Sequence, residues 1–327
     1  MGQKYSFTKL PNNAQVLALK MFDNIELIAF SLLSNRTLTL AKSLNRKADV
    51  RLVIGRDVRV EFGSTRLIFC YNGTPKLHDV DIPTAVEIEV RSWFRNNNLV
   101  RENMAMELKA WMQHIMELFN RSSLDQIIIT SDHRFPLNGI YSLLLDLKVV
   151  VLDFIFLSTP TIQAPSLLSP SQALRFGGGN PFKKSIEIQK MLLQNVPLIN
   201  VFNFENFQLN DLLSCNCRQV IARPVRIPAK QMRRWLKLWE NGANSRLKSM
   251  NFGFYSTDPE IDWFVENLVQ YTELSREVCL EYVHEEDDVR KGFELWRKDR
   301  RGMAHAVVTR EEEMNRVLCA IRMKVFN

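Results

Sequence analysis

The apolar residues between positions 10 and 45 recur at helical spacing and are interrupted by short polar breaks. From Ala14 to Leu33, 14 of 20 residues are apolar, and the polar ones are scattered round every face. The breaks at Asp23-Asn24 and Ser34-Asn35 are typical of helix caps. The pattern predicts two or three short helices, starting near Pro11 and ending near Leu44. Because they lack a continuous polar face, we expect either the rest of this chain or another protein to cover them.

After Lys47 the hydrophobic period changes from helical to strand-like. The runs VRLVIG (50–55), VRVEFG (58–63) and RLIFCY (66–71) are separated by turn residues, and apolar and charged residues alternate in 58–62 and 86–91. This alternation predicts the one-sided strands of a β-meander. Residues 101–119 then carry apolar side chains at helical spacing and predict an amphipathic helix.

From residue 125 onward, strands and helices are predicted to alternate with a repeat of about 24 residues. Strand candidates centre near Ile128, Phe154, Leu174, Val201, Val220 and Met250, and the helical runs between them cover 137–147, 185–195, 209–213 and 229–241. One strand and one helix per repeat favours a leucine-rich-repeat-like α/β solenoid with a parallel sheet and helices outside it.

Two further segments complete the predicted fold, which is α/β in the repeats and α+β over the whole chain. Residues 158–182 contain four prolines and three glycines, which predicts an irregular, ligand-facing loop. A C-terminal β-hairpin is predicted to turn near Arg301-Gly302, and RVLCAIRMKV (316–325) forms a final strand.

Composition narrows the class of protein without identifying it. The net charge of +7 comes without any block of five Lys or Arg residues, which favours a mixed-charge surface. Five widely spaced cysteines do not form a disulfide framework. Neither a signal-peptide core nor an apolar run long enough for a membrane span is present. We therefore expect a soluble protein without membrane contact, located in the cytoplasm, the nucleus or both.

Candidate chemistry is weak throughout the sequence. GGGNPFKKS (177–185) lacks the glycine that a phosphate-binding loop places before its lysine. Cys215 and Cys217 have no histidine nearby and are more typical of buried thiols than of a zinc site. HEEDD (284–288) lacks the second histidine of a metalloprotease motif. The sequence therefore predicts no enzyme, no cofactor and no metal site, and indicates a binding protein.

The helical run 229–241 leaves one alternative open. Met232, Trp235, Leu236 and Trp239 form an apolar face opposite the basic residues Lys230, Arg233, Arg234 and Lys237. A solvated basic face is the simplest interpretation, and an acidic partner or RNA is the alternative. Nucleic acid is not the expected partner.

Two stretches of the chain resemble one known family. Leu-Pro at 10–11, the apolar helix, D-x-x-E-L ending at Leu27, and the later S-N-R-T at 34–37 resemble an F-box of the large nematode families. DLLSCNCRQV (211–220) and WLKLWENGANSRL (235–247) are similar to the signature of the type 2 F-box-associated domain, about 180–255. The matching residues of this signature are Asp211, Leu212, Leu213, Asn216, Trp239, Gly242, Asn244 and Leu247.

The resemblance implies a substrate receptor of an SCF-type (Skp–cullin–F-box) ubiquitin ligase. The F-box would bind the Skp adaptor, and through it a cullin, while the C-terminal domain would hold an unknown protein substrate for ubiquitination. The positions carried over to adaptor contact are Leu10, Pro11, Leu17, Leu27, Phe30, Ser31 and Arg36. The alternative is a repeat-type interaction scaffold that acts outside ubiquitin ligation.

The predicted domains follow from the patterns and the resemblance together. Residues 4–46 are assigned to the F-box and 47–120 to the meander with its connecting helix. Residues 121–327 are assigned to the leucine-rich-repeat-like, F-box-associated substrate-binding domain.

Overall fold

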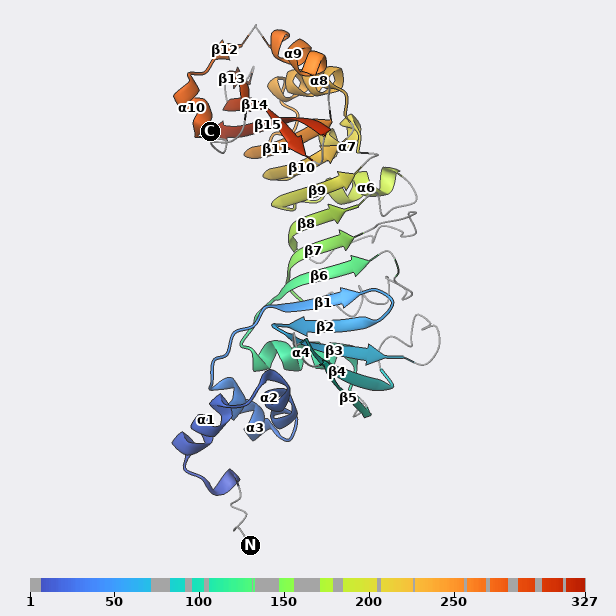
Figure 1. The fold of residues 1–327 in the computed structure, drawn as a ribbon, viewed down its shortest axis with the longest axis vertical. Helices are drawn as coiled ribbons and strands as arrows, with labels where there is room; N and C mark the ends of the chain where they lie inside the picture. Colours follow the sequence, from blue (N-terminus) through green and yellow to red (C-terminus); the bar gives the residue numbers. More distant parts are fainter. Residues whose placement is uncertain are drawn as a thin grey trace. The chain divides into compact units, whose positions relative to one another are not determined.

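A computed structural model of the chain describes residues 7–71, 83–91, 96–102, 106–130, 132, 147–155, 171–178, 185–204, 207–225, 227–255, 258–268, 271–281, 288–297, 302–313 and 316–326 (Figure 1). Two compact units divide the chain. The first comprises Met1–Val151 with Leu167–Ser169, and the second comprises Leu152–Ser166 with Pro170–Asn327. Each unit is described by itself, and the predicted three-domain boundaries stay a prediction.

The first unit begins with a short 3-10 helix and three α-helices, as the apolar pattern predicts. They are η1 (Phe7–Lys9), α1 (Asn12–Lys20), α2 (Asn24–Ser31) and α3 (Asn35–Lys42). Asp23 and Ser34 cap α2 and α3, each in a reciprocal capping box with the residue three positions later. The two polar breaks are therefore real helix starts, because their side chains bond the otherwise unpaired first N–H groups.

A mixed sheet and one long helix complete the first unit. Its strands are β1 (Val50–Ile54), β2 (Val58–Phe62), β3 (Thr65–Cys70), β4 (Ala85–Arg91), β5 (Asn96–Glu102) and β6 (Leu124–Thr130). The strands β1 to β5 pair antiparallel in sequence order, and β6 pairs parallel with β1. The predicted alternation in 58–62 is confirmed, because Val58, Val60 and Phe62 are buried and the charged residues between them are not.

Helix α4 (Leu108–Leu118) packs its apolar stripe on the buried face of this sheet. The ring centroids of Phe119 and Phe62 lie 5.4 Å apart, and those of Trp111 and Phe69 lie 6.1 Å apart. The predicted helix 101–119 therefore began too early, since Glu102 belongs to β5. The polar run Asn96–Glu102 has no apolar alternation of its own, and its strand conformation comes from pairing with β4.

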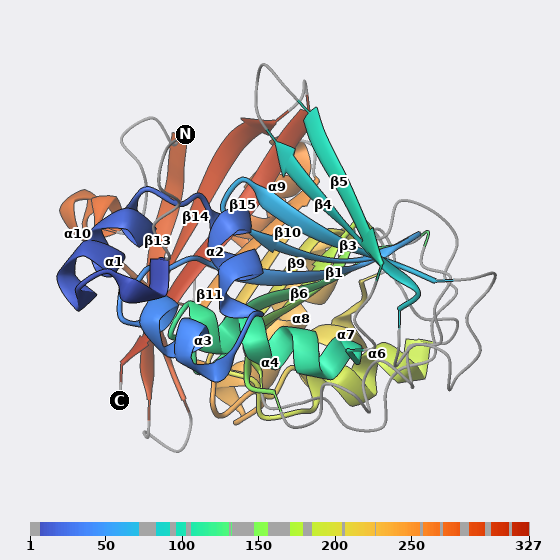
Figure 2. The ribbon, with the colours of Figure 1, turned by 90° about the horizontal axis from the view of Figure 1, so that it is seen from below.

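In the second unit, strands and helices alternate as predicted, and the leucine-rich-repeat-like solenoid stays a prediction. The strands β8 (Ser171–Gly177), β9 (Leu198–Phe204), β10 (Gln219–Val225) and β11 (Ser249–Tyr255) pair parallel in that order. Helices α6 (Ser185–Leu192), α7 (Leu209–Ser214) and α8 (Ala229–Glu240) connect them. Figure 2 shows the three helices on one side of these strands.

The C-terminal part of this unit is antiparallel. The elements are α9 (Asp258–Glu266), β12 (Thr272–Glu273), α10 (Arg276–Leu280), β13 (Asp288–Trp296), β14 (Met303–Glu313) and β15 (Arg316–Phe326). The predicted hairpin is formed by β13 and β14, and the predicted final strand β15 pairs with both β14 and β11. The sequence analysis did not predict helices α9 and α10, which have only 9 and 5 residues.

Strand β7 (Val149–Ile155) is divided between the two units. The predicted strand near Leu174 is confirmed as β8, so the irregular segment predicted over 158–182 does not include residues 171–177. Residues 158–170 and 179–182 lie outside the described part. The predicted helical run 137–147 and the acidic run 284–287 lie outside it as well, except for Leu147. Among the described residues, no helix is long and apolar enough to cross a membrane.

Candidate functional site

The positions predicted to contact an adaptor divide into exposed and buried sets. Pro11 and Arg36 are exposed, Leu10 is half-buried, and Leu17 keeps 63% of its surface accessible. By contrast, Leu27 is fully buried and Ser31 is 2% exposed. The structure therefore places only part of the predicted set on the surface of the helices.

Two other apolar side chains at the ends of these helices are more exposed than Leu17. Met21, which follows α1, is 84% exposed, and Leu33, which follows α2, is 74% exposed. Leu17 and Met21 are four residues apart at the end of α1, so they lie close to one another on its surface. In the described part of the chain, these apolar side chains at the ends of α1 and α2 are therefore left exposed.

A hollow of about 450 Å³ lies between α1 and α3. It is lined by Asn12, Gln15, Val16, Arg36, Thr39, Leu40 and Ser43. Gln15 closes one end from inside, since its side-chain amide donates a hydrogen bond of 2.7 Å to the carbonyl of Leu10. The hollow brings the predicted residue Arg36 next to apolar side chains of two helices.

Phe30 and Ser31 hold the helices together instead of facing outward. The Phe30 ring makes edge contacts with the rings of Phe7 and Phe22, whose centroids lie 5.2 and 6.0 Å from its own. The Ser31 hydroxyl donates to the Ile28 carbonyl at 2.8 Å and lies 2.8 Å from Nε2 of His114 in α4. Because the single hydroxyl proton is used toward Ile28, His114 must donate to Ser31 through Nε2–H.

The contact between Ser31 and His114 joins α2 to α4, and the imidazole that makes it is partly buried. Burial lowers the pKa of His114 below its ordinary value, which the nearby Glu117 only partly opposes. A second link is the ion pair between Lys42 and Glu117, 2.7 Å apart. The helices near the N-terminus are thus fixed to α4 by polar contacts that the sequence pattern did not indicate.

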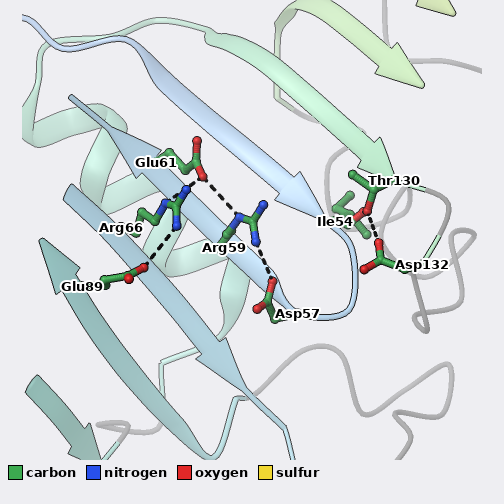
Figure 3. A network of polar contacts seen from close by, with 8 residues as sticks. All are labelled: Ile54, Asp57, Arg59, Glu61, Arg66, Glu89, Thr130 and Asp132. Atoms are coloured by element: carbon green, nitrogen blue, oxygen red, sulfur yellow. Dashed lines mark hydrogen bonds and ion pairs between the residues drawn. The ribbon is translucent and has the colours of Figure 1, made fainter. Parts of the chain in front are cut away.

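The outer face of β2, β3 and β4 carries a ladder of alternating charges (Figure 3). Glu61 lies opposite Arg66 and Arg66 opposite Glu89 in the strand register, with N–O distances of 3.0 and 3.2 Å. Arg59 extends the ladder to Asp57 and Glu61. Every one of these charges has an opposite neighbour, so the ladder stabilises the pairing of the strands and presents no reactive group.

In the second unit, the signature residues converge on one side chain, Asn244. Its amide Nδ2 lies 3.0 Å from the carbonyl oxygen of Leu212 and 2.8 Å from that of Cys215, at the end of α7. Its Oδ1 accepts a hydrogen bond of 3.0 Å from the indole N–H of Trp235 in α8. Asn244 therefore caps the C-terminal carbonyls of one helix while it anchors the next. Its φ of +48° is one that asparagine tolerates better than most residues.

The beginning of α7 is held by Asp211 in the same way. Its carboxylate accepts a hydrogen bond of 2.8 Å from the backbone N–H of Gln208 and one of 3.0 Å from the side chain of Gln189 in α6. Burial raises the pKa of Asp211, and these two hydrogen bonds oppose that shift. The nearby Asn216 donates to the side chain of Asn195 at 2.7 Å.

The remaining signature positions shape the end of α8. Leu212, Trp239 and Leu247 are buried in the core, and Leu213 is half-buried. Gly242 has a φ of +102°, a conformation that favours glycine after a helix. In the structure the polar members of the signature fix the ends of helices, and most of its apolar members lie in the core.

Sequence reasoning missed one member of this cluster, Arg297. Its guanidinium lies 4.7 Å from the Trp239 ring and donates hydrogen bonds to the carbonyls of Ala243 and Asn244 at 3.2 and 3.1 Å. The side chain is 6% exposed and comes from the end of β13, about 50 residues after the signature. No local pattern could have found it, because the contact is made only in the tertiary structure.

Cys215 and Cys217 are buried thiols, as expected. They are 3% and 1% exposed, and the Cys215 thiol donates to the Asp211 carbonyl at 3.4 Å. The neighbouring Cys217 side chain, together with burial, raises the pKa of Cys215 well above its usual value. A thiol held in its protonated form is a poor metal ligand and a poor nucleophile.

Comparison with known proteins identifies the two resembling stretches independently. Residues 7–49 match the family model of the F-box domain, and residues 187–252 match that of the F-box associated domain. The resemblance stated from the sequence is confirmed, with both domains in the expected order. No curated protein and no solved structure matches the chain.

Proposed function

We propose, from the F-box at residues 7–49 and the F-box-associated domain at 187–252, that this chain is the substrate-recognition subunit of an SCF-type ubiquitin ligase. Domains of these two kinds are typical of adaptor and interaction proteins. In this function the F-box binds a Skp adaptor, the adaptor binds a cullin, and the C-terminal part holds a protein substrate. The chain itself breaks no bond, and it acts by raising the effective concentration of the substrate near the ubiquitin-charged enzyme.

The observation that carries the proposal is the exposed apolar surface of the F-box helices. Leu17, Met21 and Leu33 are each more than 60% exposed, although a helix buries such residues when the chain can cover them. We assign adaptor binding to these side chains together with Pro11, Arg36 and the hollow between α1 and α3. Protein interfaces typically combine such apolar anchors with a polar rim.

Three of the predicted positions have a different part in this proposal: Leu27 and Ser31, which are buried, and Phe30, which is half-buried. Leu27, Phe30 and Ser31 pack the helices against one another and against α4, so they fix the shape of the adaptor surface from below. Substituting them would reduce adaptor binding through unfolding of the helices. A test of contact must therefore use the exposed residues.

The experiment measures binding of the purified full chain to a Skp adaptor by calorimetry. Leu17→Asp combined with Leu33→Asp is expected to weaken binding by at least about 30-fold, since buried apolar anchors contribute about 2 kcal/mol or more each. The matched control is Leu193→Asp, which introduces the same change at a 57% exposed leucine after α6. Circular dichroism of each variant establishes that the helices remain folded.

Failure of the wild-type chain to bind the adaptor would contradict the proposal, and so would an equal loss in the Leu193→Asp control. The scaffold alternative makes a separate prediction in cells. If the chain binds partners without directing their ubiquitination, the levels of every bound partner stay constant when the cullin is inhibited. A receptor instead predicts that at least one bound partner accumulates.

A further inference from the structure

The F-box-associated part of the chain holds an unusual excess of positive charge. Residues 171–255 contain 13 Lys and Arg residues against 4 Asp and Glu residues, whereas the whole chain has 43 against 36. The excess in this segment exceeds the net charge of +7 of the entire chain. Part of this excess, including Arg234 and Lys237, lies on the helices, whereas Arg175 and Arg223 lie on the strands. Basic residues on the strands attract acidic partners toward the sheet itself.

One face of the parallel strands in this segment is not covered by helices α6 to α8. Along β9, Ile199 and Val201 are buried toward the helices, and Asn200 and Phe202 alternate with them on the opposite face. The strand register places Arg175 of β8 and Ile221 of β10 on either side of Asn200. The same row continues through Asn251 to Arg322.

Phe202 is the exposed aromatic residue at the centre of this open face. It keeps 47% of its surface accessible, and its register neighbours are Gly177 on one side and Arg223 on the other. A Cβ placed on Gly177 would meet only the Phe154 carbonyl oxygen, at 3.8 Å, so the space beside the ring is open. An aromatic ring with an open flank and arginines nearby has the composition of an interface hot spot.

We propose that the open face around Phe202 is the substrate-docking surface, and that it takes an acidic protein segment carrying an apolar side chain. Arg175 and Arg223 bind the carboxylates, because a guanidinium pairs with a carboxylate through two parallel hydrogen bonds. The apolar side chain of the substrate packs beside Phe202 over Gly177. The term substrate rests on the proposed function; the surface and its ligand chemistry do not.

A protein segment fits this face better than a nucleic acid does. Single-stranded nucleic acid is held by successive aromatic side chains along a groove, each of which stacks a base. The described residues of β8 to β11 present Phe202 as their exposed large apolar side chain on this face, with Ile221 half-buried and amides between. Such a surface suits one apolar anchor flanked by carboxylates.

The experiment selects a displayed library of random short peptides against the purified full chain. The selected peptides are expected to be enriched in Asp and Glu around an apolar residue. One selected peptide is then synthesised together with a twin in which every Asp and Glu is replaced by Asn and Gln. We expect the twin, and separately Phe202→Ala, to weaken binding at least about tenfold, and Arg175→Glu with Arg223→Glu to abolish it.

The matched control introduces the same charge change on a different basic surface. Arg234 and Lys237 lie on the exposed side of α8, so Arg234→Glu with Lys237→Glu should leave peptide affinity unchanged. Thermal melting of each variant establishes that it is folded. Peptides without acidic enrichment, unaltered affinity of Phe202→Ala, an equal loss in the α8 control, or tighter binding of a single-stranded RNA than of the peptide would each overturn the proposal.

Peptide binding and adaptor binding are read out separately, so the two proposals can fail independently. A chain that binds the acidic peptide through Phe202 without binding a Skp adaptor retains the docking surface and loses the ligase function. A chain that binds the adaptor while selecting no acidic peptide retains the ligase function and loses this surface.

Discussion

At the scale of single residues, the side chain of Asn244 makes hydrogen bonds to two helices. One side chain satisfies the carbonyls that end α7 and receives the indole N–H that fixes α8. A buried polar group that loses its partner costs about 1 to 3 kcal/mol, and Asn244 partners three such groups. This is the physical reason for an asparagine at this position of the signature.

We expect Asn244→Ala to lower the free energy of unfolding by about 3 kcal/mol or more, measured by urea denaturation. Asn244→Gly should be almost as destabilising, although glycine adopts the positive φ more easily. Asn241→Ala, which removes one exposed hydrogen bond to the Lys237 carbonyl, is the control and should cost under about 1 kcal/mol. A fully stable Asn244→Gly variant would show that only the backbone conformation matters.

His114 is a residue whose protonation state depends on its burial in the folded chain. Burial lowers its pKa in the folded state, so between that pKa and the ordinary value of 6.5 the unfolded chain binds more protons. The stabilising contribution of the neutral ring is therefore complete above pH 6.5 and is lost as the pH falls through the folded-state pKa.

The variant His114→Gln tests this pH dependence, because glutamine can donate to Ser31 without titrating. As the pH is lowered from 7 to 5, wild type should lose more free energy of unfolding than the variant, as measured by urea denaturation at each pH. Identical pH profiles for the two proteins would contradict the assignment.

At the scale of elements, close approach between strands limits what each turn can contain. Gly55 ends β1 beside Thr130 of β6, whose hydroxyl donates a hydrogen bond of 2.5 Å to Asp132 (Figure 3). A Cβ on Gly55 would lie 2.6 Å from the Thr130 hydroxyl and 3.2 Å from the Asp132 carboxylate. The glycine that marks the end of the predicted first strand is thus required by a neighbour about 75 residues away.

We expect Gly55→Ala to lower the free energy of unfolding by about 1 to 3 kcal/mol, because either the strands separate or the Thr130 hydroxyl loses its position. In Gly55→Ala combined with Thr130→Ala, the contact is relieved and part of the stability should return. Thermal denaturation of the single and double variants measures this coupling. Simple additivity of the two losses would argue against a direct clash.

At the scale of the whole molecule, the reactivity of the cysteine thiols shows whether each unit is folded, because most of the thiols are buried. Cys215, Cys217, Cys279 and Cys319 are buried, and Cys70 is half-buried. Burial also raises the pKa of Cys70 and Cys279 and so reduces their reactive thiolate fraction.

A thiol reagent at neutral pH should therefore label at most Cys70 quickly in the native protein, and all five cysteines after denaturation. Mass spectrometry of the labelled protein over time identifies each site. Rapid native labelling of Cys215 or Cys217 would be inconsistent with the core of the second unit as described.

The sequence alone determined the features that depend on neighbouring residues. The caps at Asp23 and Ser34, the one-sided strand at 58–62 and the alternation of strands with helices after residue 170 are local patterns, and each is present in the structure. The F-box-associated signature was also recognisable in the sequence, because it resembles that of a known family, and the family model matches residues 187–252.

Only the tertiary structure decided the rest. The polar segment Asn96–Glu102 is a strand because β4 pairs with it, and Arg297 joins the signature because β13 ends beside α8. Leu27 and Phe202 are both apolar residues of regular elements, yet one is fully buried and the other is exposed on an open sheet face. Which apolar residues remain for a partner depends on what the distant parts of the chain cover, and no local pattern contains that information.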